Sequence, residues 1–233
     1  MQSEYIVYIF LFTVFATAGF LLYALWTAHR KRPLIYLSAV LLGGWMYLQA
    51  YLAGSGFYLT IDGKPRFLLA VAPMALLIVC LFVFRRTRDF LGSISLPVLT
   101  LLSIVRIAVE FVIDGWYHAG LAPRLMTFEG RNFDIISGIT APVVFFLAFR
   151  GKTNRPLLIG WNILCLLLLL NIVVNAVTSA PGPLQVQAFD QPNIAVLQYP
   201  FIWLPSVIVP AVLFSHLVSL WQLLSKTARS PAA

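Results

Sequence analysis

Charged side chains are scarce in this chain. Asp, Glu, Lys and Arg make up 10% of its 233 residues, against about 25% in ordinary soluble domains. Hydrophobic residues make up 61%, against roughly 45–50%. So few charges cannot solvate the surface of a soluble protein of this length, so the composition indicates an integral membrane protein. The net charge of +8 is therefore better explained by membrane topology than by a nucleic-acid partner, and none is expected.

Cysteines are rare, and the common catalytic and cofactor motifs are missing. Cys80 and Cys165 lie inside apolar segments and offer neither a disulfide framework nor metal-ligand spacing. The zinc motif His-Glu-x-x-His, the Walker A loop and Gly-x-Ser-x-Gly are absent. No lysine lies in the middle of an apolar segment, as a retinal Schiff base would require, and the lone histidines do not suggest haem. No metal or cofactor is predicted, and no catalytic residue is assigned.

Apolar segments near the length of a membrane span recur along the whole chain. A helix needs about 17–25 apolar residues to cross roughly 30 Å of hydrocarbon. We expect the first segment to be retained as a span, because Glu4 precedes it without a basic region and it is too long for a signal peptide. The sequence predicts a single all-α integral membrane domain over residues 1–233, a bundle of seven transmembrane helices. Its predicted spans are 5–28, 34–53, 67–84, 91–113, 133–149, 157–178 and 199–224.

Basic residues orient this predicted bundle. Eleven of the 16 follow the odd-numbered spans: Arg30, Lys31, Arg32, Arg85, Arg86, Arg88, Arg150, Lys152, Arg155, Lys226 and Arg229. Under the positive-inside rule these loops are cytoplasmic, which places the N-terminus outside and the C-terminus in the cytoplasm. Asn-x-Ser/Thr sequons are absent, which favours a bacterial inner (plasma) membrane over a eukaryotic cell surface.

Two similar segments raise the hypothesis of an internal repeat. Arg32-Pro33-Leu34-Ile35 opens the second span, and Arg155-Pro156-Leu157-Leu158 opens the sixth. Three helices, a linker helix and three more would be similar to the arrangement of the SWEET sugar transporters, but the Pro-Gln dipeptide associated with that class is missing. The alternative is that proline is favoured in any first helical turn and arginine at any cytoplasmic end.

One predicted span carries ionisable residues at helical spacing. Arg106, Glu110, Asp114 and His118 follow one another at intervals of four, along one ridge of a helix. A charge at the bilayer centre costs at least about 2.5–3.5 kcal/mol unless it is paired or hydrated. The ridge is therefore a candidate functional site, in the outer half of the membrane.

The loop after this span supplies the matching charges. Glu129, Arg131, Asn132 and Asp134 lie on the same predicted side, and with Arg124 they bring the ridge close to electrical neutrality. Such a balance suits a structural network of ion pairs, and it also suits a site in which one carboxylate holds a proton or a cation. We predict that the ridge and these four loop residues form one ligand-binding cluster.

The last predicted span is rich in proline. Pro200, Pro205 and Pro210 each remove a backbone hydrogen bond, so this helix is expected to be kinked or partly unwound. It can form a cavity wall or a moving element, or it can be a static kink.

These features predict a membrane protein that binds or transports a small polar solute or ion in an outward-facing charged cavity. Besides the lipid bilayer, that solute is the only partner predicted. One alternative is an intramembrane enzyme that acts on a lipid or another membrane-borne substrate by carboxylate acid/base or metal chemistry. A second alternative is a non-catalytic sensor or accessory subunit, in which the ridge faces outward to pair with a partner helix.

Overall fold

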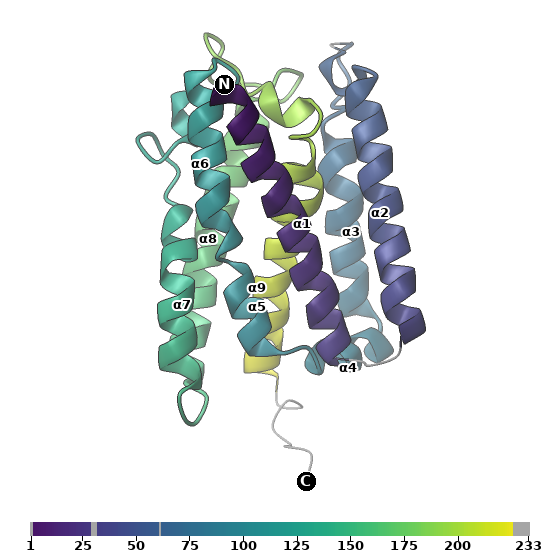
Figure 1. The fold of residues 1–233 in the computed structure, drawn as a ribbon, viewed down its shortest axis with the longest axis vertical. Coiled ribbons are helices and arrows are strands. Elements are labelled where there is room, and N and C mark those ends of the chain that lie inside the picture. Colours follow the sequence, from purple (N-terminus) through teal and green to yellow (C-terminus); the bar gives the residue numbers. More distant parts are fainter. Residues whose placement is uncertain (1, 29–31, 61, 226–233) are drawn as a thin grey trace.

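The computed structural model describes residues 2–28, 32–60 and 62–225. It is 75% helix, with no strand among these residues. The longer helices lie side by side along the long axis of the molecule (Figure 1). The α-helices are α1 (Gln2–Ala28), α2 (Arg32–Gly54), α3 (Leu68–Val83), α4 (Arg85–Gly92), α5 (Leu96–Leu102), α6 (Val105–His118), α7 (Ile135–Phe149), α8 (Arg155–Ser179) and α9 (Val209–Leu224). The short turns are η1 (Phe57–Leu59), η2 (Arg124–Met126), η3 (Ala195–Leu197) and the π-helical η4 (Leu204–Ile208).

Most of the predicted spans are present as helices. Within the described ranges, five are long and apolar enough to cross a membrane: Glu4–Ala28, Arg32–Gly54, Leu96–His118, Arg155–Ser179 and Leu204–Leu224. The bent pair α3 and α4 gives a sixth if it counts as one span. The remaining predicted span corresponds to α7, which has only 15 residues. The all-helical prediction is confirmed, whereas the count of seven spans remains a prediction.

The boundary between the third and fourth predicted spans was wrong. Residues 85–92 form the separate helix α4, bent by 94° from α3, and the next span begins at Leu96 rather than at residue 91. The bend occurs at Phe84, whose backbone is extended, and Thr87 Oγ1 donates to the carbonyls of Leu81 and Phe84 across it. Counted from Leu96, Arg106 lies about 15 Å along its helical segment, near the middle. Counted from residue 91, it would lie about 22 Å along, nearer the outer end.

The last span contains the expected distortion. It begins at Leu204 rather than 199, with the π-helical turn η4 leading into α9. Two tryptophans tie this region to α2: Trp45 Nε1 donates to the Ser206 carbonyl and Trp203 Nε1 to the Met46 carbonyl, both at 2.9 Å. π-Helical turns are rare and occur frequently at functional sites. Leu204, Pro205 and Ile208 of η4 line a cavity.

Helix α1 packs closely on α6, and an aromatic cluster fills the contact. A Cβ at Gly115 would lie 2.3 Å from Ile6 Cδ1, so the glycine permits the approach without ending the helix, which continues to His118. Trp116 contacts Phe10 and Phe201 with ring centroids 6.1 and 4.8 Å apart. Trp116 is buried in this core.

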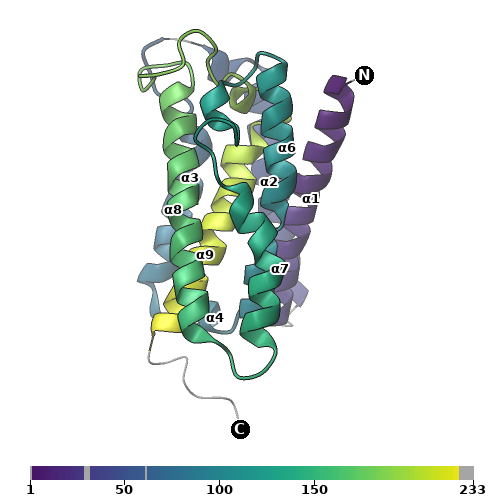
Figure 2. The same cartoon turned by 90° about the vertical axis from the view of Figure 1, so that its left-hand side faces the viewer.

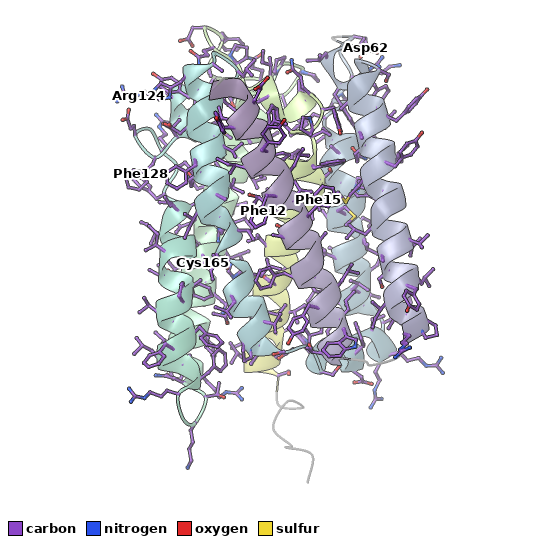
Figure 3. All side chains as sticks on the ribbon, viewed as in Figure 1. Phe12, Phe15, Asp62, Arg124, Phe128 and Cys165 are labelled. Carbon is purple, nitrogen blue, oxygen red and sulfur yellow. The ribbon has the colours of Figure 1, made fainter. Side chains whose placement is uncertain are left out.

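The described basic residues of the predicted cytoplasmic loops gather at one end of the bundle, here called the basic end. It contains the start of α2, α4 and the turn between α7 and α8 (Figures 1 and 2). Asp62 and Arg124 lie at the opposite end (Figure 3). His29, Arg30, Lys31, Lys226 and Arg229 fall outside the described residues. In the view of Figure 2, α9 is seen in the gap between α8 and α7, and α1 lies on the right-hand side.

The turn η1 is anchored by one buried phenol. Tyr58 donates to Gln49 Oε1 at 2.6 Å, and burial raises the pKa of Tyr58 to about 12. In the unfolded chain the Tyr58 phenol ionises near pH 10. Its contribution to the free energy of unfolding is therefore fully present below pH 10 and is lost as the pH rises toward 12.

We expect Tyr58→Phe to lower the free energy of unfolding by about 1 kcal/mol at pH 8, because the buried Gln49 oxygen loses its donor. The difference from wild type should shrink at pH 11, where the wild type has lost stability and the variant has no phenol to ionise. Thermal unfolding in detergent at both pH values measures this. An equal difference at pH 8 and pH 11 would contradict the assignment.

Candidate functional site

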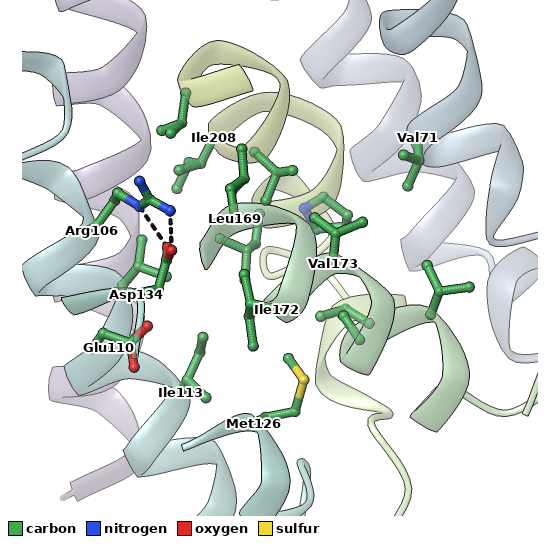
Figure 4. A pocket seen from close by; sticks show the side chains of 18 of the residues that line it. Val71, Arg106, Glu110, Ile113, Met126, Asp134, Leu169, Ile172, Val173 and Ile208 are labelled. Carbon is green, nitrogen blue, oxygen red and sulfur yellow. Dashed lines mark hydrogen bonds and ion pairs between the residues drawn. The ribbon is translucent and has the colours of Figure 1, made fainter. Parts of the chain in front are cut away.

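Four of the predicted site residues meet in the interior. Arg106 and Glu110 come from α6, while Asn132 and Asp134 come from the loop that leads into α7, and each is at most 5% exposed. Arg106 and Asp134 form a bidentate ion pair: Nε donates to Oδ2 at 2.6 Å, and Nη2 donates to Oδ1 (Figure 4). Both oxygens of Asp134 are thus engaged by one guanidinium.

Arg106 also reaches two neighbouring helices. Its Nη1 lies 3.2 Å from His216 Nε2 on α9, and its Nη2 lies 3.3 Å from the Cys165 carbonyl on α8. A guanidinium can only donate, so His216 Nε2 must accept and its proton is on Nδ1. That Nδ1 is 2.8 Å from Asn162 Oδ1 and donates to it. The hydrogen bonds therefore assign His216 as a neutral imidazole.

Asn132 links the Glu110 carboxylate to the backbone of Asp134. Its Nδ2 donates to Glu110 Oε1 at 2.6 Å and to the Met126 carbonyl at 2.9 Å, while its Oδ1 accepts from the Asp134 amide at 3.0 Å. The second oxygen of Glu110, Oε2, is buried and has no hydrogen-bond partner among the described residues. A buried carboxylate oxygen without a donor is costly, so this atom marks a place for a missing partner.

Two glycines allow the loop and α7 to reach these positions. A Cβ at Gly138, one turn after Asp134, would lie 2.7 Å from Ile107 Cγ1 and 3.0 Å from Ile107 N. The glycine lets α7 approach α6 closely enough for Asp134 to meet Arg106. A Cβ at Gly130 would lie 2.2 Å from the Arg124 carbonyl oxygen, so only glycine fits where the loop folds back on itself.

A cavity of about 50 Å³ adjoins the Glu110 carboxylate (Figure 4). One water needs roughly 10–15 Å³ measured in this way, so the space holds about four water-sized groups. Arg106, Glu110 and Asp134 are its charged lining, and the rest is almost entirely apolar. The apolar walls come from α3, α6, α8 and the η4–α9 segment and include Val71, Val109, Ile113, Leu169, Ile172 and Ile208.

The buried charges do not balance. Arg106 contributes one positive charge, while Asp134 and Glu110 contribute two negative charges when both are ionised, and His216 is neutral. An unpaired charge in such surroundings is strongly destabilising. Either Glu110 holds a proton, or a cation enters the cavity beside it.

The other predicted site residues do not join this cluster. Asp114 and His118 are exposed, with His118 Nδ1 3.5 Å from Asp114 Oδ2. Glu129 is exposed, with its Oε2 3.9 Å from Arg124 Nη2, and Arg131 is also exposed. The expected single cluster is thus divided into a buried group and a set of surface pairs. The reason is helical rotation: each step of four residues turns the ridge by about 40°, so His118 has turned by about 120° from Arg106.

His216 and Asn162 are site residues that spacing could not link to Arg106. The sequence shows each as an isolated polar residue in an apolar span, 110 and 56 positions from Arg106. Only the packing of α6, α8 and α9 brings them together. Within the described residues there is no group of three or more His, Cys, Asp and Glu side chains that could hold a metal ion.

A family model described as a domain of unknown function (DUF8737) matches residues 66–224. The chain belongs to this family. The matched DUF8737 region contains all the buried polar residues of the site, from Arg106 to His216, and leaves out α1 and α2. No curated protein and no solved structure matches the chain.

Proposed function

We propose that this DUF8737 protein is a multi-pass protein of the inner (plasma) membrane that binds a small polar solute in the cavity beside Glu110. The proposed topology has seven spans, with α7 as a short fifth span and α3 as the third, which ends in the bent helix α4. The N-terminus lies outside and the C-terminus in the cytoplasm. The sidedness of the described basic residues supports this orientation.

The observation that carries the proposal is the free oxygen of Glu110. It is buried, it belongs to a side chain that lines a cavity, and it lies beside a carboxylate that is already neutralised by Arg106. A solute with an N–H donor and a positive charge would satisfy both the hydrogen bond and the charge balance. A small protonated amine has this chemistry, and its alkyl part suits the apolar walls.

The same geometry favours an amine over a hard metal cation. Calcium takes 6–8 oxygen ligands, and magnesium takes six at short distances. The cavity offers Glu110 Oε2 as its free carboxylate oxygen, since both Asp134 oxygens accept from Arg106. An alkylammonium ion needs only one strong acceptor and apolar contacts for the remainder.

The size of the cavity bounds the affinity. A solute of about four non-hydrogen atoms gains at most about 1.5 kcal/mol per atom, or about 6 kcal/mol in all. This corresponds to a Kd no tighter than about 40 μM. A binding experiment therefore needs millimolar solute.

The described conformation supports binding rather than passage. Among the described residues, the side-chain contacts that lead from Arg106 toward the basic end reach His216 and then Asn162. Beyond them an apolar cluster of Val144, Ala148, Leu158, Trp161 and Leu223 occupies the basic end. Toward the opposite end, Phe67 and Val177 line both this cavity and a smaller pocket near Lys64, so they lie where a solute would enter from outside.

The two alternatives fit the geometry less well. Acid/base catalysis by paired carboxylates needs a second free carboxylate, and Asp134 is held by Arg106. An accessory subunit needs the ridge to face outward, but Arg106 and Glu110 face the interior.

The test is a thermal-shift titration of the detergent-purified protein with ethylammonium chloride, with sodium chloride at equal ionic strength as the reference. We expect ethylammonium at 10–100 times its Kd to raise stability by about 1.4–2.7 kcal/mol in the wild type and to have no specific effect on Glu110→Gln. The matched control Glu129→Gln removes an exposed carboxylate and should respond like the wild type. An equal shift in Glu110→Gln, or none in the wild type, would refute the proposal.

A further inference from the structure

A second and much larger cavity lies at the basic end of the bundle. It has a volume of about 950 Å³, near the upper limit of the roughly 300–1,000 Å³ typical of ligand pockets. Its walls come from α1, α2, α3 and α9 and are apolar, with Leu41, Trp45, Leu77 and Phe214 among them. Leu41 and Leu77 remain 63% and 49% exposed, so the protein itself does not cover this surface.

The cleft is separate from the cavity beside Glu110. The η4–α9 segment forms a wall between them: Leu204, Pro205 and Ile208 line the Glu110 cavity, while Val207, Pro210 and Ala211 line the cleft. The two sites therefore lie on opposite faces of the distorted part of the last span.

The charged residues of the cleft lining lie at one end. Arg86 and Asp89 of α4, beside Thr87 and Ser93, form this rim. The helix α4 is bent by 94° from α3, as a helix must be to run along a membrane surface at the end of a span. It is held in place at its end, because Gln222 Nε2 on α9 donates to the carbonyls of Leu91 and Ile94 at 2.6 and 2.9 Å.

The charge of helix α4 favours an anionic group at this rim. The helix carries Arg85, Arg86 and Arg88 against one carboxylate, Asp89, a net charge of +2, and of these four residues Arg86 and Asp89 line the cleft. Arginine is suited to phosphate because its guanidinium donates two parallel hydrogen bonds. Basic segments at the cytoplasmic end of a span attract anionic lipid head groups.

We propose that this cleft is a binding site for one anionic phospholipid of the cytoplasmic leaflet. The acyl chains occupy the apolar cleft between α2 and α3, and Arg86 binds the phosphate of the head group. The inference rests on the proposed membrane orientation but not on amine binding at Glu110, so either can fail without the other.

Native mass spectrometry tests this proposal. The full chain is titrated with phosphatidylglycerol, released from detergent, and the number of lipids that stay bound is measured. We expect the wild type to retain one phosphatidylglycerol in preference to phosphatidylcholine. Arg86→Gln should weaken that affinity by about tenfold, because the guanidinium that binds the phosphate is lost. The matched control Arg85→Gln removes the same charge from a residue that does not line the cleft, and its affinity should stay close to that of the wild type.

A second pair of variants tests the cleft itself. Ser38 lines the cleft on α2, and Ser38→Phe should narrow it and reduce phosphatidylglycerol retention. Val40 lies outside the cleft lining and is 70% exposed, so Val40→Phe should change nothing. Thermal unfolding verifies that the variants remain folded. Equal retention of both lipids, equal effects of the two arginine variants, or unchanged retention in folded Ser38→Phe would each overturn the proposal.

Discussion

Replacing Arg106 by methionine should lower the free energy of unfolding by about 3–5 kcal/mol, because it leaves the buried Asp134 carboxylate without its counter-charge. Asp134→Leu should be equally damaging, since the guanidinium then lacks its carboxylate. Either loss is a large part of the roughly 5–15 kcal/mol of stability that a domain possesses. Both variants should show little folded protein on size-exclusion chromatography in detergent.

The double variant Arg106→Met with Asp134→Leu should recover most of that stability. Removing both charges together avoids the unpaired state, and replacing a buried ion pair by apolar groups of similar volume is often neutral or stabilising. Arg124→Met is the matched control, because it breaks an exposed pair with Glu129 and should change little. A double variant as unstable as either single variant would show that the pair is needed for more than charge balance.

Gly130→Ala should destabilise the protein by about 2–3 kcal/mol, a large effect for one added methyl group. The new Cβ would lie 2.2 Å from the Arg124 carbonyl oxygen and 2.7 Å from Leu125 Cα, and backbone atoms cannot rotate away. The loop must open, and Asn132 and Asp134 move with it. The site should therefore be disturbed although no polar group has been removed.

Thermal unfolding in detergent measures this effect, and the turn between α7 and α8 offers a control. A Cβ added at Gly151 would meet no described atom within 4 Å, so Gly151→Ala should leave the melting temperature nearly unchanged. If Gly130→Ala melts at the temperature of the control, the loop is more adaptable than its close backbone contact implies.

Composition and segment length sufficed to predict helices of membrane-spanning size. Long apolar runs have few other ways to satisfy their backbone hydrogen bonds in a membrane, so their approximate limits follow from hydrophobicity alone. The distortion near Pro205 was predictable for a similar reason, since proline removes a backbone donor wherever it occurs in a helix. The bend at Phe84 was not, because no glycine or proline marks it and the hydrogen bonds of Thr87 stabilise it across the break.

By itself, the sequence determined that this chain is helical, apolar and asymmetric in its basic residues, and that Arg106 and Glu110 are charges in an apolar span. The tertiary structure alone decided which polar groups share the interior. Helix rotation directs Arg106 and Glu110 inward and leaves Asp114 and His118 exposed. The packing of separate helices brings His216 and Asn162 to Arg106 and leaves Glu110 Oε2 buried without a hydrogen-bond partner among the described residues. Such contacts depend on how whole helices are placed in space, which local spacing does not specify.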